Sequence, residues 1–247
     1  MTILVIGASR GLGYEFCKYF KSQGHQVIGV GRTPLTQIKN NEIFFDYCQF
    51  DVTSIEADTR LEKFIELHSN AISGLVNNVG KSNWRSLKAL DTAFIDEMFN
   101  INLKQMFLVT RLVVQKCHTL NAIVNMASIA GRRGSKNNSV YSGLKFGVVG
   151  LTQSLAKELG ATGIRVNCVS PVLIETTGLK DALGDSDSPL LNQNLEEYFT
   201  SFASSQSALE RLPSAEEVAS VIDFLLSEKS SAITGQNVNV DCGVFPQ

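Results

Sequence analysis

The stretch that decides the fold is Gly-Ala-Ser-Arg-Gly-Leu-Gly at residues 7–13. It follows an apolar run, Ile3–Ile6, and opens an amphipathic stretch, Leu12–Gln23, with Gly24 where a helix cap is expected. Glycines here allow a tight turn and a close approach of the backbone to a pyrophosphate, whose charge a helix N-terminus stabilises. The stretch predicts a dinucleotide-binding turn, although a plain strand–helix turn has similar glycines.

Apolar runs of strand length continue along the chain and alternate with longer amphipathic segments. They lie at Val27–Val30, Phe44–Phe50, Gly74–Val76, Ala122–Met126, Ile164–Val169 and Val238–Val240. Strands that are apolar throughout are buried on both faces, and their alternation with helices makes them parallel. We therefore expect one α/β domain over residues 1–247, built on a single doubly wound (Rossmann-type) parallel sheet with helices on both faces. The segment Thr33–Asn41 is short and polar and leaves little room for a crossover helix.

Composition excludes several classes of protein. The hydrophobic fraction of 44% and the charged fraction of 19% are those of a globular protein. A net charge of -2 gives no electrostatic reason to expect nucleic acid or an anionic membrane as partner. The run Met1–Gly7 lacks the features of a signal peptide, and no apolar stretch reaches the roughly 18 residues of a membrane span.

The cysteines and histidines suggest neither disulfides nor a metal. The chain has five cysteines, an odd number, and none form a C-x-x-C pair. This usage is typical of reduced thiols, so we expect a cytoplasmic protein. The histidines are scattered without metal-like spacing, and they are His25, His68 and His118.

A second motif, Tyr141-Ser142-Gly143-Leu144-Lys145, can carry acid–base chemistry. On a helix, residues four apart share a face, so Tyr141 and Lys145 would be neighbours. An ammonium near a phenol favours the phenolate and lowers a pKa that starts at about 10. A tyrosine tuned in this way can act as general acid or base. By itself, such a pair also occurs on solvated helices.

Further motifs, found in a fixed order along the chain, indicate that Tyr141 and Lys145 have a catalytic role. Ser128 lies thirteen positions before Tyr141, Asn-Asn-Val-Gly occupies residues 77–80, and Asn102 lies between these two elements. From Ile3 to Gly243 the sequence resembles the short-chain dehydrogenase/reductase family, in the branch with an Asn–Ser–Tyr–Lys tetrad, and it is similar to 3-oxoacyl-acyl-carrier-protein reductases. The resemblance implies an oxidoreductase that transfers a hydride between a nicotinamide cofactor and a ketone or secondary alcohol.

The resemblance also implies a role for each catalytic residue. Tyr141 would donate and accept the proton, and Lys145 would lower its pKa and bind the nicotinamide ribose. Ser128 would hold the substrate oxygen, and Asn102 would hold a water that links Lys145 to solvent. No metal is implied. The residues implied to contact the cofactor are Gly7, Ser9, Arg10, Gly11, Leu12, Gly13, Arg32, Asp51, Val52, Asn78, Val79, Gly80, Tyr141, Lys145, Pro171, Leu173, Ile174 and Thr176.

The chain departs from the family pattern at four positions. Val79 stands where the family usually has Ala, and Gly143 stands where Ala or Ser is frequent. Val172 follows Pro171 in place of Gly, which bears on the loop beside the expected nicotinamide site. Cys242 replaces a frequent Gly near the C-terminus.

The choice of dinucleotide depends on the end of the second strand. NAD-binding sites usually carry an acid there to bind the ribose 2′-hydroxyl, and this chain has Gly31. Arg32 follows at once, and Arg10 lies in the glycine turn. Two guanidiniums without a carboxylate suit a 2′-phosphate, so we expect NADP(H) rather than NAD(H). The alternative is that both arginines are merely solvated.

The substrate is less constrained than the reaction. The stretch Ile233–Gln236 and the general layout look similar to those of 3-oxoacyl reductases and sugar dehydrogenases. We expect a 3-oxoacyl-like small-molecule ketone, with a sugar or secondary-metabolite ketone as the alternative. A non-catalytic dinucleotide-binding regulator is an alternative of another class, but it would not need all four tetrad residues.

Two further expectations concern a lid and assembly. The long segment 177–212 has a polar middle and a helical apolar stripe, so we expect it to close over the site as a mobile lid; a stripe packed permanently on the core is the alternative. Family resemblance implies a homo-oligomer, a tetramer or a dimer. Apolar residues that can serve a helix interface, or equally face the sheet, are Phe107, Leu108, Leu112, Val148, Val149 and Leu151.

Overall fold

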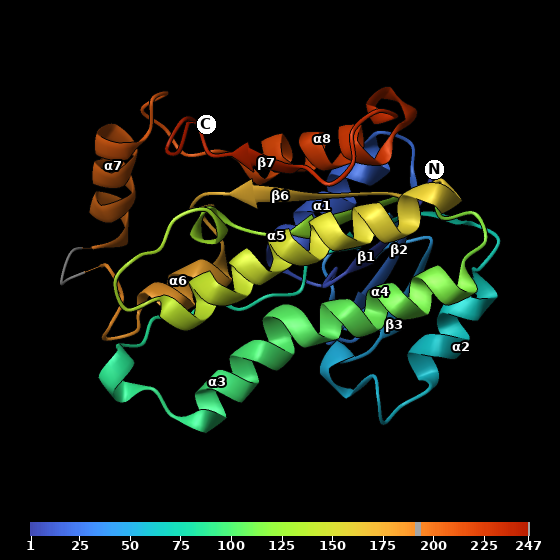
Figure 1. The fold of residues 1–247 in the computed structure, drawn as a ribbon, viewed down its shortest axis with the longest axis horizontal. Coiled ribbons are helices and arrows are strands. Elements are labelled where there is room, and N and C mark those ends of the chain that lie inside the picture. The colour runs from blue at the N-terminus through green and yellow to red at the C-terminus, as the bar shows by residue number, and fades with distance from the viewer. Residues whose placement is uncertain (191–193, 247) are drawn as a thin grey trace.

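The computed structural model describes residues 1–190 and 194–246 and contains one sheet of parallel strands (Figure 1). The strand order is β3-β2-β1-β4-β5-β6-β7. The order reverses between β1 and β4, and open parallel sheets bind ligands at this point, beyond the carboxyl ends of the strands. The predicted doubly wound sheet is confirmed. The strands are β1 (Thr2–Ile6), β2 (Gln26–Gly31), β3 (Asp46–Gln49), β4 (Ile72–Asn77), β5 (Ala122–Met126), β6 (Arg165–Pro171) and β7 (Asn237–Val240).

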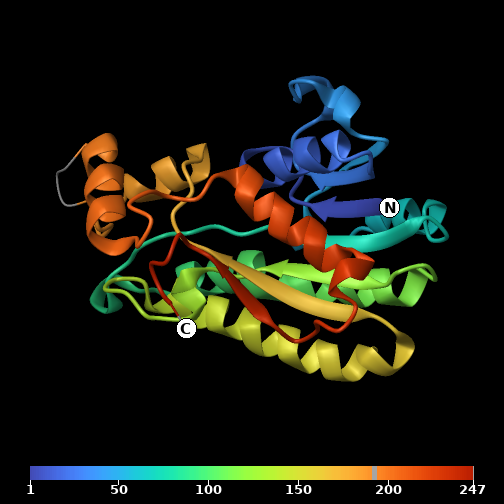
Figure 2. The same ribbon diagram turned by 90° about the horizontal axis from the view of Figure 1, so that it is seen from above.

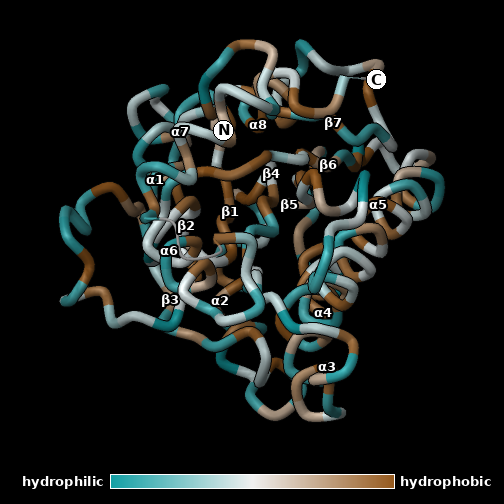
Figure 3. The backbone as a smooth tube through the Cα atoms, turned by 90° about the vertical axis from the view of Figure 1, so that its left-hand side faces the viewer, coloured by the Kyte–Doolittle hydropathy of each residue, from teal (hydrophilic) through white to brown (hydrophobic). Residues whose placement is uncertain are grey.

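Helices cover both faces of the sheet, as the apolar strands require. Helices α1 and α8 pack on one face, and α2, α4 and α5 pack on the other; these two sets lie on opposite sides of the strands in Figure 3. None of the described helices is long and apolar enough to span a membrane. The helices are α1 (Gly11–Ser22), α2 (Arg60–Leu67), α3 (Thr92–Phe99), α4 (Gln105–Lys116), α5 (Ser139–Leu159), α6 (Thr177–Leu183), α7 (Leu195–Gln206) and α8 (Ala215–Leu226).

The connection from β2 to β3 holds no α-helix. It contains two short 3₁₀ turns, Leu35–Gln37 and Asn41–Ile43. The short polar segment 33–41 predicted this exception to the alternating pattern. The edge strand β3 therefore lies beside β2 without a crossover helix to cover that corner of the sheet.

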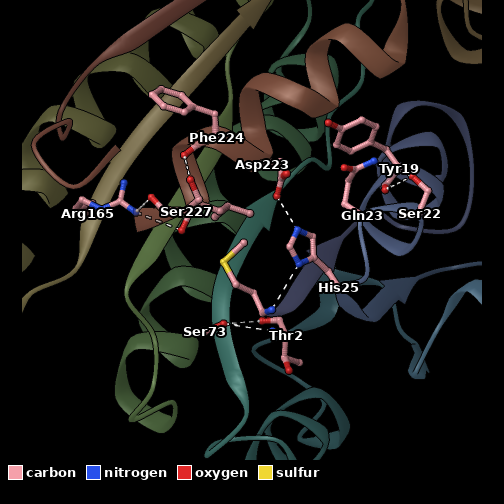
Figure 4. Close-up of polar contacts among 12 residues, drawn as sticks. Thr2, Tyr19, Ser22, Gln23, His25, Ser73, Arg165, Asp223, Phe224 and Ser227 are labelled. Carbon is pink, nitrogen blue, oxygen red and sulfur yellow. Dashed lines mark hydrogen bonds and ion pairs between the residues drawn. The ribbon is translucent and has the colours of Figure 1, made fainter. Parts of the chain in front are cut away.

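The amino ends of the strands are tied together by polar contacts (Figure 4). Nε2 of His25, which precedes β2, lies 2.8 Å from Oδ1 of Asp223 on α8. Arg165, at the start of β6, donates to the carbonyl oxygen of Ser227 at 3.0 Å and to the carbonyl oxygen of Leu225 at 2.6 Å. These bonds satisfy carbonyls at the end of α8. This end of the sheet is closed, whereas the carboxyl ends of the strands face a cavity.

Segment 177–212 folds into α6 and α7, and α7 stands beyond the carboxyl ends of the strands, well away from the sheet (Figure 2). Hydrogen bonds from other parts of the chain hold its described residues. The Asp187 carboxylate accepts from the backbone N–H of Ser86 at 2.8 Å, and the Cys242 carbonyl accepts from the Ser207 hydroxyl at 2.9 Å. Cys242 adopts a φ of 54°, a left-handed conformation that favours glycine. A non-glycine residue therefore takes a backbone conformation here that glycine adopts more easily.

Candidate active site

A cavity of about 1070 Å³ lies beyond the carboxyl ends of the strands. Its wall is formed by the glycine turn, the end of β2, the loops after β3, β4, β5 and β6, and part of segment 177–212. Every expected catalytic or cofactor residue lines it except Gly13 and Asn102, which lie directly behind the wall. The structure thus brings together residues that are up to 169 positions apart, from Gly7 to Thr176.

The glycine turn has the shape of an anion cradle. Gly7 and Gly11 have positive φ values of 84° and 54°. A Cβ at Gly13 would lie 2.0 Å from the carbonyl oxygen of Gly7, so only glycine fits there. Helix α1 begins at Gly11 without a capping side chain and without an acid in its first turn. Its free N–H groups and positive dipole end fit the pyrophosphate of a dinucleotide.

Tyr141 lies in the first turn of α5 and faces Ser128. Ser128 caps the 3₁₀ turn Ile129–Gly131, where its Oγ accepts from the N–H of Ala130 at 3.1 Å. Burial raises the pKa of Tyr141 to about 12, although its hydrogen bond with Ser128 acts in the opposite direction. The free protein therefore holds Tyr141 as a neutral hydroxyl, the form that donates a proton.

Lys145 lies one helical turn further along α5 and is only 3% exposed. Its Nζ donates to the carbonyl oxygen of Met126 at 2.8 Å and lies 5.6 Å from the ring centroid of Tyr141. Burial lowers the pKa of Lys145 to about 8. That Lys145 lowers the pKa of Tyr141 stays a prediction: in the free protein, burial and the hydrogen bond with Ser128 set the pKa of Tyr141. Desolvation disfavours both charged forms, and the ammonium bonds Met126 rather than the phenol.

Asn102 holds the loop after β4 rather than lining the cavity. It lies in a π-helical interruption, Asn100–Lys104, between α3 and α4, and such interruptions are frequent at functional sites. Its fully buried amide accepts from the N–H of Lys81 at 3.0 Å and donates to the carbonyl oxygen of Lys81 at 3.1 Å. A Cβ at Gly80 would lie 3.1 Å from Oδ1 of Asn102 and 3.4 Å from Nζ of Lys145. Gly80 therefore lets the two catalytic candidates approach each other.

The other expected cofactor residues fix the loops around the cavity. Asp51 accepts from the N–H and the hydroxyl of Thr53 at 3.0 and 2.8 Å. Asn78 donates to the carbonyl oxygen of Gly7 at 3.4 Å, and Thr176 caps α6 by accepting from Leu179 at 3.2 Å. Val172 is not among the described residues with positive φ, so the missing glycine causes no backbone strain there.

Sequence reasoning missed part of the cavity wall. The lining residues that were missed belong to no family motif. One signal for some of them was available, because the polar run 135–138 lies between the catalytic candidates Ser128 and Tyr141. Asn137 there has a φ of 58° and donates to the carbonyl oxygen of Asp187 at 3.2 Å, which joins this loop to segment 177–212. The missed lining residues include Trp84, Arg133, Lys136 and Asn138.

Comparison with known proteins identifies the family. Residues 7–245 match the model of a family described as Enoyl-(Acyl carrier protein) reductase. The chain is 30% identical to the 3-oxoacyl-[acyl-carrier-protein] reductase FabG of Chlamydia trachomatis serovar D, over 98% of this chain and 96% of that protein. This chain belongs to the short-chain dehydrogenase/reductase family. The resemblance stated from the motifs is confirmed.

Two further matches show the breadth of this family. The chain is 31% identical to a 7alpha-hydroxysteroid dehydrogenase of Bacteroides fragilis, over 98% of this chain and 93% of that protein. The solved structure of a variant actinorhodin polyketide ketoreductase with NADPH has a TM-score of 0.87 and 28% identity, and covers 98% of this chain and 96% of that one. This short-chain dehydrogenase/reductase is an oxidoreductase that uses a nicotinamide dinucleotide to interconvert carbonyl and alcohol groups.

Proposed function

We propose that the enzyme is an NADP(H)-dependent reductase of 3-oxoacyl-like ketones, with Tyr141, Ser128, Lys145 and Asn102 as its catalytic set. The observation that carries the cofactor preference is the closed end of β2. A Cβ at Gly31 would lie 2.7 Å from Oγ of Ser9 and 2.8 Å from the hydroxyl of Tyr47. The acid that NAD-binding sites place there would have to displace the side chains of Ser9 and Tyr47.

Two arginines favour the binding of NADP(H). A second cavity, of about 340 Å³, is lined by Arg10 and Arg32 together with Ser9, Thr33 and Gln37. Both arginines are exposed, and neither has an ion-pair partner among residues 1–190 and 194–246. Guanidiniums bind phosphate with paired hydrogen bonds. A 2′-phosphate is the group that would occupy this position.

The mechanism assigns one task to each catalytic residue. A nicotinamide bound in this cavity would supply the hydride for reduction, or accept it in the reverse reaction. The Ser128 hydroxyl holds the carbonyl oxygen beside Tyr141, and the neutral Tyr141 hydroxyl gives that oxygen its proton. The Lys145 ammonium then stabilises the phenolate that forms. Asn102 fixes the backbone of Lys81 in the cavity wall beside Lys145. That Asn102 also holds a water that links Lys145 to solvent stays a prediction.

The substrate proposal rests on the relatives. FabG proteins are named as 3-oxoacyl-[acyl-carrier-protein] reductases. Two other relatives are named as a 7alpha-hydroxysteroid dehydrogenase and a polyketide ketoreductase. The aromatic side chains of Tyr198 and Phe202 on α7 line the cavity and suit an apolar portion of such a substrate. A sugar or secondary-metabolite ketone is the second candidate, which the polar lining residues Asn137 and Asn138 favour.

We also propose that segment 177–212 works as a mobile lid over the cavity. The chain is proposed to form one domain and to be located in the cytoplasm. Phe202 and Tyr198 line the cavity, whereas Phe199 does not line it and is only 8% exposed. Part of the segment, residues 191–193, lies outside the described residues. The cytoplasmic location is supported by the five unpaired cysteines.

The homo-oligomer, a tetramer or a dimer, is proposed from exposed aromatic residues. Phe107 on α4 is 47% exposed, and Phe146 on α5 is 48% exposed. Val148 and Leu151 could have served an interface or faced the sheet; they are in the core at 0% and 7% exposure, in a cluster with Ala127 and with Cys168 of β6. The interface candidate is therefore the opposite stripe of α4 and α5.

The first prediction concerns Tyr141→Phe. The ring is retained and only the titrating hydroxyl is lost, so turnover should fall by about 10²–10⁴-fold while dinucleotide binding stays nearly unchanged. Steady-state ketone reduction and cofactor fluorescence titration measure the two effects. Near-wild-type turnover would contradict the proposed mechanism.

The second prediction concerns Arg32→Ala. Only NADPH carries the 2′-phosphate, and a hydrogen bond to a charged group contributes about 1.5–3 kcal/mol. The variant should therefore bind NADPH more weakly by about tenfold or more and bind NADH almost as before. Arg60→Ala, an exposed arginine paired with Asp58, is the control. A wild-type preference for NADH would show that the cofactor proposal is wrong.

The third prediction tests the lid. Phe202→Ala should raise KM or lower kcat with little loss of stability, whereas Phe199→Ala should lower the melting temperature because its ring is buried. Hydrogen exchange of segment 177–212 should slow when NADPH and a ketone substrate are added. Strong protection that is the same with and without ligands would support the rigid alternative.

The fourth prediction tests assembly. Light scattering at micromolar concentration should give a mass of two or four chains, and Phe107→Glu combined with Phe146→Glu should reduce it, because charges are disfavoured in the core of an interface. Lys88→Glu, in the loop before α3, serves as a charge control. A monomeric mass for the wild-type protein would refute the proposal.

A further inference from the structure

Strand β2 carries two glycines on one face, and aromatic rings cover them. Gly29 and Gly31 are two positions apart, so they share a face of the strand. A Cβ at Gly29 would lie 2.6 Å from the ring of Phe44 and 2.8 Å from the ring of Tyr47. Tyr47, on the neighbouring strand β3, pairs with Gly29 in the sheet register. The missing side chains on β2 thus make room for the Tyr47 ring to lie along the strand toward its carboxyl end.

The hydroxyl of Tyr47 reaches the point where β2 ends. It donates to the carbonyl oxygen of Thr33 at 2.7 Å and forms a second hydrogen bond with Ser9. Because its proton is used for Thr33, it accepts from the Ser9 hydroxyl. One phenol therefore links the glycine turn, which carries Arg10, to the loop that carries Arg32.

Both ends of this link belong to the smaller cavity. Ser9 and Thr33 line it together with the two arginines, whereas Tyr47 lines neither cavity. Burial raises the pKa of Tyr47 to about 12, so the phenol stays a neutral donor through the neutral pH range. Any action of Tyr47 on a ligand must therefore pass through Ser9 and Thr33.

We propose that Tyr47 is a positioning residue for cofactor selectivity: its hydroxyl fixes the spacing between the glycine turn and the Arg32 loop so that Arg10 and Arg32 meet on one 2′-phosphate. The same hydroxyl occupies the space that an acid at position 31 would need. This inference rests on the proposed preference for NADP(H). It adds a residue on β3 that lines neither cavity and belongs to no binding motif.

The test is the variant Tyr47→Phe, which keeps the ring over the glycines and removes only the hydroxyl. Fluorescence titration should show NADPH binding weakened by about five- to tenfold and NADH binding changed by less than about twofold, because one or two neutral hydrogen bonds are lost. The readout is the ratio of the two dissociation constants, which a general loss of stability would not move selectively. Tyr19→Phe, a partly buried tyrosine on α1 away from both cavities, is the matched control.

The outcomes separate the two proposals. A wild-type enzyme that prefers NADH overturns the proposed cofactor and this inference with it. A wild-type enzyme that prefers NADPH, with the same ratio in Tyr47→Phe, overturns this inference alone. If Tyr47→Phe does not fold, Gly31→Ala tests the same link, because its Cβ would displace the Tyr47 hydroxyl and Ser9. That variant should lower the NADPH preference, and an unchanged ratio contradicts the inference.

Discussion

The active site depends on the burial of one lysine. Lys145 is 3% exposed, and its main hydrogen bond is to the carbonyl of Met126 at the end of β5. Placing an ammonium out of water is costly unless it is bonded, so this contact holds α5 against the carboxyl end of the sheet. Two glycines leave space for the buried Lys145. A Cβ at Gly131 would lie 2.6 Å from the carbonyl oxygen of Lys145, and Gly80 leaves room beside its Nζ.

Burial of Lys145 also sets its protonation. Its pKa is lowered to about 8 from an ordinary value of 10.5. The folded chain therefore holds this proton more weakly than the unfolded chain, so the burial opposes folding below about pH 8. Between about pH 8 and 10.5 the folded chain has released this proton and the unfolded chain still holds it, so stability rises with pH and the opposition is gone near pH 10.5. A lysine of this kind can respond to a ligand near neutral pH, whereas Tyr141, with a raised pKa, stays protonated until charge develops beside it.

The sequence predicted the fold more completely than it predicted the site. Strands such as β1 and β5 were predictable because they are mostly apolar, and the glycine turn was predictable because Gly7 and Gly13 satisfy a strict steric demand. The order of the motifs then indicated the cavity. Family motifs located Asn102 but not its place behind the wall, because the π-helical interruption that buries it has no compositional signal. The raised pKa of Tyr141 in the free protein was not predicted for a related reason: desolvation depends on the packing around a group, and helical spacing reveals only which groups are neighbours.

The most direct test of this account is a titration of the Lys145 side chain by nuclear magnetic resonance on protein with isotope-labelled lysine. The resonance that is lost in Lys145→Met identifies the residue. The account predicts that in the free protein this resonance titrates with a pKa of about 8, because the ammonium is buried against Met126. A resonance that titrates near the ordinary value of 10.5 would mean that Lys145 is solvated, and the structure of the site described above would then be wrong.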